Sequence, residues 1–335
     1  MREKESKALS VTGKQKIVLG FDGRSFLDSI LKALGDDYEY VYLSPKQRKN
    51  FVFRNTAHRL AYWALYEIKR TALHITQCLK ADVVIFIFPN RFTFFYTKLA
   101  NIFKKKVVYY WYGSDVFYLI QKPWRLDKWA CRIDKHVAHG AFIIKELTTV
   151  GIDAELLYVP PDLSFELARM PMEHAVLLSI PDSRAEFYGY STMIELIKAF
   201  PQTTFYVVRS DSPHRYDYPN VIFKGTLSPT EMEALFDEVS IVVRYPEHDS
   251  VSMILTEALA KGKSLISRFN FPYEGARIAT DFEELCKALE AALKDPLEPD
   301  LKGHEYVKQN FSKERFRQEL NRYIKALFDD QSSKR

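Results

Sequence analysis

One stretch of the sequence concentrates charged and hydroxyl side chains between a predicted strand and a predicted helix. It runs from Arg244 to Gly262 and reads RYPEHDSVSMILTEALAKG. The pattern predicts a buried strand ending at Arg244, a polar loop, and a helix stopped by Gly262. Asp249 lies in the loop and Glu257 inside the helix, eight residues later. Both carboxylates can therefore face one ligand above the strand end.

The predicted start of this helix is an anion site. The first backbone amides of a helix have no intrahelical partner, and the helix dipole favours a negative group beside them. We expect the amides of Ser250, Val251 and Ser252 to bind a phosphate. Asp249 and Glu257 would then accept hydrogen bonds from sugar hydroxyls on either side. The alternative is that a serine caps the helix and Glu257 is a solvated helix residue.

Alternating strands and helices surround this stretch. Continuous apolar strands that alternate with helices predict an α/β fold with parallel sheets covered on both faces. The predicted strands are 16–21, 38–43, 81–88, 106–113, 135–140, 154–161, 174–180, 204–210, 220–225, 239–245 and 263–268. The predicted helices are 24–35, 58–80, 93–105, 142–150, 192–201, 229–238, 252–262, 281–294 and 311–328.

The pattern restarts after a segment rich in proline, residues 161–173. We therefore predict two sequential Rossmann-like domains, residues 1–165 and 166–310, followed by a helix and tail over 311–335. Ligands of such sheets bind outside the carboxyl ends of the strands. Two domains that face each other would place a cleft between those ends.

The composition narrows the class of protein. With 47% hydrophobic and 27% charged residues, the 335-residue chain is not a mainly disordered one. The three cysteines are far apart, which excludes a disulfide framework and offers no zinc spacing. The most apolar stretch, 83–96, is interrupted by Pro89, Asn90 and Arg91, well short of the ~20 apolar residues of a membrane span. The charged start lacks the apolar core of a secretory signal, so we expect a cytoplasmic protein.

Charge is divided unevenly between the two halves. Residues 1–165 hold 26 Lys and Arg against 16 Asp and Glu, whereas residues 166–335 hold 22 against 27. In the basic half, cationic side chains stand beside aromatic ones, a combination that suits an anionic membrane surface. The alternative is that the aromatic residues are core and the cations merely solvated. The cations are Arg54, Arg59, Lys69, Arg70, Lys104, Lys105 and Lys106.

The segment HDSVSMILTEALAKGKSLIS resembles the signature of GT-B glycosyltransferases of the retaining, family-4-like type (glycosyltransferase group 1). In that family an acid and a glutamate eight positions later lead into an E-A-x-A-x-G helix and a buried strand. The resemblance implies that Asp249 contacts a donor sugar and that Glu257 binds the ribose of its nucleotide. The family usually has Glu-Gly where this chain has Asp249-Ser250.

Further segments resemble the same family in the same order. Residues 176–201 are similar to the strand, loop and helix that open the donor domain, with Arg184 at the position of the diphosphate-binding arginine. Tyr188 and Gly189 stand near the family's lysine, so Arg209 or Arg244 is expected to supply the second cation. Residues 134–163 and 220–244 resemble the end of the first domain and the base-contacting segment. The family's P-N-G-V-D is altered to Pro-Pro-Asp at residues 160–162.

The first domain offers weaker motifs. The turn at residues 20–23 ends in Gly23, where the family brings backbone close to the diphosphate; an ordinary tight turn is the alternative. Residues 111–115, WYGSD, resemble a family turn that borders the acceptor. Asp115 is therefore expected to hold an acceptor hydroxyl or to cap the next helix. His136 and His139 flank a strand, and only one is expected to face the cleft.

The resemblance implies a transferase that moves a sugar from a nucleoside-diphosphate sugar to a hydroxyl acceptor with retention. The expected acceptor is lipid-linked or a growing glycan, with peripheral contact to the inner face of an anionic membrane and no nucleic acid. No cofactor is expected, and no metal, because the sequence has no DxD motif. Asp115, Asp249 and Arg184 are the expected catalytic residues. The alternatives are a nucleotide-sugar 2-epimerase and a degraded subunit that only binds nucleotide sugars.

Overall fold

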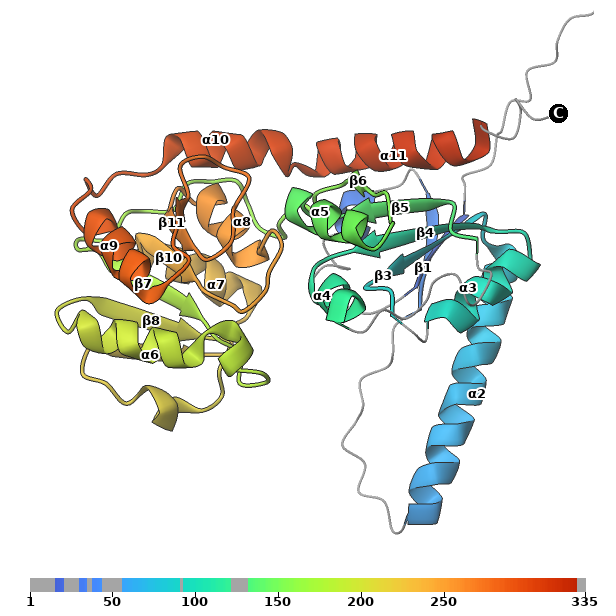
Figure 1. The fold of residues 1–335 in the computed structure, drawn as a ribbon, viewed down its shortest axis with the longest axis horizontal. Coiled ribbons are helices and arrows are strands. Elements are labelled where there is room, and N and C mark those ends of the chain that lie inside the picture. The colour runs from blue at the N-terminus through green and yellow to red at the C-terminus, as the bar shows by residue number, and fades with distance from the viewer. Residues whose placement is uncertain are drawn as a thin grey trace, which may run out of the picture.

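Two parallel sheets of six strands each organise the chain (Figure 1). The computed structural model describes residues 16–20, 30–34, 38–43, 56–90, 93–121 and 132–329. The first sheet has the order β2-β1-β3-β4-β5-β6 and the second β12-β11-β10-β7-β8-β9. All pairings are parallel. This confirms the predicted α/β class with two Rossmann-like domains.

The strands lie close to their predicted positions. Those of the first sheet are β1 Lys16–Gly20, β2 Glu39–Leu43, β3 Val83–Ile87, β4 Lys106–Trp111, β5 Lys135–Ala138 and β6 Glu155–Leu156. Those of the second are β7 Ala175–Ser179, β8 Thr204–Val208, β9 Val221–Gly225, β10 Ile241–Arg244, β11 Ser264–Ser267 and β12 Arg277–Ile278. Every residue of β3 and β7 is buried, as expected of strands covered on both faces.

Helices connect the strands and cover the sheets. They are α2 Thr56–Lys80, α3 Thr93–Ile102, α4 Ser114–Gln121, α5 Ala141–Thr149, α6 Tyr190–Ala199, α7 Pro229–Leu235, α8 Met253–Ala260, α9 Phe282–Ala292, α10 Leu301–Asn310 and α11 Lys313–Asp329. Short 3-10 turns follow β7, β8 and α7. Of the predicted helix 24–35, residues 30–34 are described, and they are helical.

The strand order of each sheet reverses at one point. In the second sheet β7 pairs with both β8 and β10, so the chain runs outward in one direction from β7 and in the other from β10. In open α/β sheets, the loops that leave the carboxyl ends of two such strands diverge, and ligands usually bind there. In the first sheet the reversal lies between β1 and β3.

The last two helices return the chain to the first domain (Figure 1). Val307 of α10 and the following Phe311 belong to the core of the second domain. After a break at Ser312, α11 places an apolar stripe in the core of the first domain. This confirms the predicted crossing helix. The stripe consists of Phe316, Leu320, Tyr323, Ile324 and Leu327.

Some elements were not predicted. Helix α10, LKGHEYVKQN, buries only Gly303 and Val307 and therefore lacks a clear apolar periodicity. Strand β6 is shorter than the predicted 154–161, and beyond it the amide of Val159 donates to the ring of His139 and not to a neighbouring strand. Helix α4 and the two-residue β12 were also missed.

We expect the Ile324→Ala substitution to lower the free energy of unfolding of the first domain by about 2–5 kcal/mol, because it leaves a cavity in the core. Ile324 has no exposed surface. Tryptophan fluorescence during urea unfolding measures this domain selectively, since all four tryptophans lie within residues 1–165. Lys325→Ala on the exposed face of the same helix is the control, with an effect below about 0.5 kcal/mol. Equal effects of the two substitutions would contradict the described packing.

Candidate functional site

The carboxyl ends of the strands of the two domains face each other and are in contact. A side-chain carbon at Gly140, which follows β5, would lie 2.6 Å from the Oγ of Ser250 and 3.3 Å from a methyl group of Val251. A side-chain carbon at Gly113, after β4, would lie 3.4 Å from the Cβ of Ser250. The two glycines therefore let the loop after β10 approach the backbone of the first domain.

An ion pair between the buried Arg244 and the partly exposed Asp249 sets the shape of this loop. The Nε of Arg244 donates to Asp249 over 2.9 Å, and its Nη1 donates to the carbonyl oxygen of Ser179 over 3.1 Å. Arg244 is 8% exposed. Asp249 also accepts a hydrogen bond from the amide of Ser250. Arg244 thus neutralises and orients Asp249, instead of serving as the open cation that the sequence suggested.

The ring of Tyr188 lies near two arginines, close to the position where the resemblance implies a lysine. The guanidinium of Arg244 lies 4.7 Å from the ring centre of Tyr188 and that of Arg184 lies 5.6 Å from it. Such cation–π contacts contribute ~0.5–2 kcal/mol. Arg184 is exposed and also donates to the hydroxyl groups of Tyr188 and of Tyr118, in the first domain, over 3.2 Å each. Arg184 is therefore the arginine placed to meet a ligand.

The start of α8 presents polar groups without partners. Ser252 occupies the N-cap position, and its side chain makes no capping hydrogen bond. Within the described residues, three buried side-chain atoms near these strand ends have no hydrogen-bond partner: the Oγ of Ser179, the Nδ1 of His248 and the Oγ of Ser250. Buried polar groups are normally satisfied. The cluster is thus suited to a polar ligand.

Glu257 is a partly buried acid on α8. Burial raises its pKa to about 7, with the carboxylate of Asp162 acting in the same direction and the guanidinium of Arg209 opposing both. Arg209 is exposed at the end of β8 and has a left-handed backbone, φ +67°. In the described part of the chain, the Glu257 carboxylate has no hydrogen-bond or ion-pair partner. Hydroxyl donors from a ligand would stabilise its ionised form.

His248 joins the two domains, a contact that the sequence did not suggest. Its Nε2 lies 3.0 Å from both carboxylate oxygens of Glu146 on α5. Because a carboxylate only accepts, Nε2 carries the hydrogen and leaves Nδ1 as an acceptor in the neutral ring. Phe117, Phe142 and Phe269 surround the imidazole, with ring centres 4.9, 5.7 and 5.9 Å away. These contacts keep the two domains together around the loop.

Asp115 binds its own turn. Its carboxylate accepts hydrogen bonds from the amides of Tyr112, Gly113 and Val116 over 2.7–3.1 Å. Burial raises its pKa to about 6, and these hydrogen bonds oppose the shift. The geometry therefore favours the helix-start alternative over a direct bond to an acceptor hydroxyl. Its function here is to shape the turn that contacts Ser250.

The two histidines beside β5 have structural partners. The Nδ1 of His136 accepts from the indole of Trp111 over 3.1 Å, and that of His139 accepts from the amide of Val159 over 3.0 Å. Burial lowers the pKa of each to about 4. Hydrogen bonding to the backbone of Val251 partly opposes the shift at His139. His139 therefore also reaches the loop after β10.

Other predicted features lie elsewhere. Gly23 and Arg54 fall outside the described residues.

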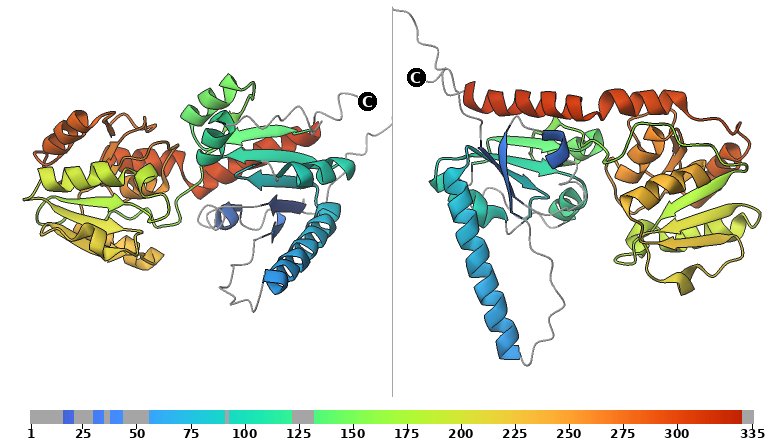
Figure 2. Two further views of the ribbon diagram at one scale, coloured as in Figure 1. Left: turned by 60° about the horizontal axis from the view of Figure 1, so that its bottom comes forward. Right: turned by 180° about the vertical axis from the view of Figure 1, so that it is seen from behind.

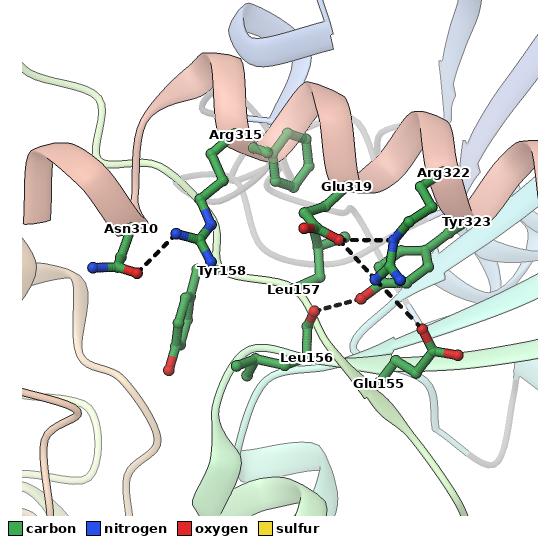
Figure 3. Close-up of a pocket in the computed structure, with 10 residues that line it drawn as sticks. Glu155, Leu156, Leu157, Tyr158, Asn310, Arg315, Glu319, Arg322 and Tyr323 are labelled. Atoms are coloured by element: carbon green, nitrogen blue, oxygen red, sulfur yellow. Dashed lines mark hydrogen bonds and ion pairs between the residues drawn. The ribbon is translucent and has the colours of Figure 1, made fainter.

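The described ranges hold no group of three or more metal-ligating side chains. None of their helices combines the length and apolar composition needed to cross a bilayer. A cavity of about 310 Å³ lies between α11 and the segment that includes β6, and its lining includes Leu157 and Tyr158, which follow that strand (Figure 3). It contains none of the predicted site residues.

No protein-family model and no curated protein matches the sequence. Solved structures do match. Sucrose-phosphate synthase from Thermosynechococcus elongatus covers 94% of this chain and 100% of its own, with TM-score 0.69 and 12% identity. The lipopolysaccharide outer core galactosyltransferase WaaB covers 93% and 99%, with TM-score 0.60 and 14% identity. The UDP-GlcNAc 2-epimerase from Methanocaldococcus jannaschii covers 94% and 100%, with TM-score 0.52 and 14% identity.

A further match is partial. Structures of S. aureus TarM cover 76% of this chain, with TM-score 0.55 and 12% identity, and this chain spans only 58% of TarM. At such identities the likeness establishes the fold. The chain has the GT-B fold, and its predicted resemblance to GT-B glycosyltransferases is confirmed.

We expect Gly189→Ala to loosen the loop after β10. Gly189 has φ +81°, and a side-chain carbon there would collide with the carbonyl oxygen of Tyr245. Gly151→Ala is a matched control, because Gly151 has a similar φ of +76° and nothing within 4 Å. In each variant, an alanine in this left-handed backbone conformation costs roughly 1–2 kcal/mol. Hydrogen exchange of residues 245–252 should rise only in Gly189→Ala, and equal exchange in both variants would contradict the described contact.

Proposed function

We propose that this protein is a glycosyltransferase that moves a sugar from a nucleoside-diphosphate sugar to a hydroxyl acceptor with retention of configuration. One observation carries the proposal. Arg184 follows β7, and α8 with the partly buried Glu257 follows β10, the two strands between which the strand order of the second sheet reverses. An anion site, a cation and an acceptor for hydroxyl groups are together what a nucleotide sugar requires.

In the proposed complex, each part of the donor contacts one of these groups. Its diphosphate lies just before α8, with the backbone amides of Val251 and Ser252 on one side and Arg184 on the other. The amide of Ser250, also expected from the sequence, already donates to Asp249. Its ribose donates to Glu257, with Arg209 nearby. Its sugar contacts Asp249, which Arg244 orients.

The reaction needs charge stabilisation more than a protein nucleophile. The bond between the anomeric carbon and the diphosphate oxygen breaks, and its electron pair stays on the diphosphate. The acceptor oxygen forms a bond to the same face of that carbon, and the acceptor proton passes to the departing phosphate. Arg184 and the helix amides stabilise the charge that develops on the leaving group. The scheme uses no metal and no cofactor.

The acceptor is assigned to the first domain. The net charge of +10 over residues 1–165 suits an acceptor that bears phosphate, such as a lipid-linked sugar, or a growing glycan at an anionic membrane surface. Asp115 supports the turn beside this acceptor site. The protein is then a cytoplasmic one, in peripheral contact with the inner face of the membrane.

A 2-epimerase is the second candidate, because a UDP-GlcNAc 2-epimerase shares the fold over almost the whole chain. An epimerase inverts one carbon of the sugar and returns it as a nucleotide sugar, whereas a transferase releases nucleoside diphosphate only when acceptor is present. Incubation with a nucleotide sugar alone separates the two. A third candidate is a binding subunit without activity. It would bind the donor but form neither an epimerised nucleotide sugar nor free nucleoside diphosphate.

We expect Glu257→Ala to weaken the binding of a nucleoside diphosphate by about 10- to 100-fold, because it removes charge-assisted hydrogen bonds. Titration calorimetry with a panel of nucleoside diphosphates measures this. Glu283→Ala is the control, since Glu283 is an exposed residue of α9. Unchanged affinity in Glu257→Ala would contradict the assignment of the ribose site. Failure of every nucleotide to bind the native protein would contradict the function itself.

The affinity should also depend on pH. The carboxylate of Glu257 must be ionised to accept ribose hydroxyl groups, and its pKa lies at about 7 in the folded protein. From pH 6 to pH 8 the ionised fraction rises about tenfold, so the dissociation constant should fall about tenfold and protons should be released on binding. Glu257→Gln retains the titration of the nucleotide and of other residues. A pH dependence that is equal in Glu257→Gln and native protein would exclude this mechanism.

A further inference from the structure

Helix α2 projects from the first domain. Figures 1 and 2 show that its N-terminal half stands away from the sheet, while its C-terminal half lies beside α3. In that C-terminal half, His74 stacks on Tyr96 of α3 with ring centres 4.1 Å apart. Cys78, one helical turn later, is buried as well. These two residues mark the face of α2 that packs on the domain.

The opposite face of α2 carries exposed apolar side chains. With 3.6 residues per turn, they lie within about 140° of one another, and the centre of this arc is opposite His74 and Cys78. The arc also includes the exposed Lys69 and Lys80. We call it the α2 stripe. Its apolar members are Tyr62, Leu65, Ile68, Leu73 and Leu79, with exposures of 37%, 59%, 64%, 48% and 52%.

Helix α3 also has exposed apolar side chains beside an exposed lysine. Phe95 and Ile102 are 54% and 63% exposed, and Lys98 lies on the same face of the helix between them. Large exposed apolar side chains that recur on adjacent helices indicate a surface that binds something. Lysines among them can keep their charged ends in a polar layer while their stems lie along apolar surface.

The charge of this region specifies the partner. Residues 56–106 contain nine Lys and Arg but only two Asp and Glu. A second copy of the chain would bring the same positive charge against it and would be repelled. Apolar side chains interleaved with lysines are typical of helices that lie at the interface of an anionic bilayer.

We propose that the α2 stripe binds the surface of an anionic membrane, with its apolar side chains inserted at the headgroup boundary and Lys69 and Lys80 on the lipid phosphates. The inference extends the proposed function, because it brings the first domain to the surface where a lipid-linked acceptor resides. It does not depend on the donor site, so either can fail alone.

The test is co-sedimentation of the full chain with vesicles of phosphatidylcholine containing 30% phosphatidylglycerol. The native protein should bind these vesicles more tightly than pure phosphatidylcholine vesicles and should be released by salt. The double substitution Leu65→Ser/Ile68→Ser should weaken binding at least tenfold. Lys69→Gln should weaken it by roughly fivefold, the contribution of one charge near the surface. Met172→Ser/Leu301→Ser, which removes two exposed apolar side chains of the second half of the chain, is the matched control and should bind normally.

The nucleotide affinity and the melting temperature of each variant are measured as controls. Both should stay at native values in the stripe variants, which separates loss of membrane binding from loss of the donor site or of the fold. Equal binding of the native protein to neutral and anionic vesicles would overturn the proposal. So would a dimer of the native chain that the stripe substitutions dissociate, or a large drop in melting temperature in Leu65→Ser/Ile68→Ser, which would show that the protein itself covers the stripe.

Discussion

The ion pair between the buried Arg244 and the partly exposed Asp249 governs the geometry of the candidate site. Arg244 ends a central strand inside the protein, where an unpaired guanidinium is costly, so the following loop must turn back to bring a carboxylate to it. That turn fixes the positions of the loop's other residues. It places His248 against Glu146 and Ser250 against the backbone of the first domain. Removing Asp249 costs about 3–5 kcal/mol, because the charge of Arg244 stays buried.

Local patterns were enough to predict most of the fold and the central helix of the site. Apolar runs and helical periodicity gave the strands and most helices, and the Asp249–Glu257 spacing identified α8. Contacts between distant residues could not be predicted in this way. The partnership of His248 with Glu146 spans 102 residues and leaves no local pattern. Arg244 was predicted as an open cation because its partner is set by how the loop folds, which periodicity does not describe.

The two halves of the chain differ in net charge. The second half is net negative, so its proposed anionic ligand depends on a few local groups, namely helix amides and an arginine held by Tyr188. Tyr188 lies near the position where the resemblance implies a lysine, and the guanidinium groups of Arg184 and Arg244 both lie near its ring. The first half has a general excess of positive charge. Its function in the proposed account is to bring the protein to an anionic acceptor and the surface around it.

A crystal structure with a bound nucleoside diphosphate tests the central claim most directly. The account predicts the diphosphate within hydrogen-bond distance of the amides at the start of α8 and of Arg184, and the ribose hydroxyl groups on Glu257. Density for the nucleotide in the cavity beside α11, or at the strand ends of the first sheet alone, would contradict it.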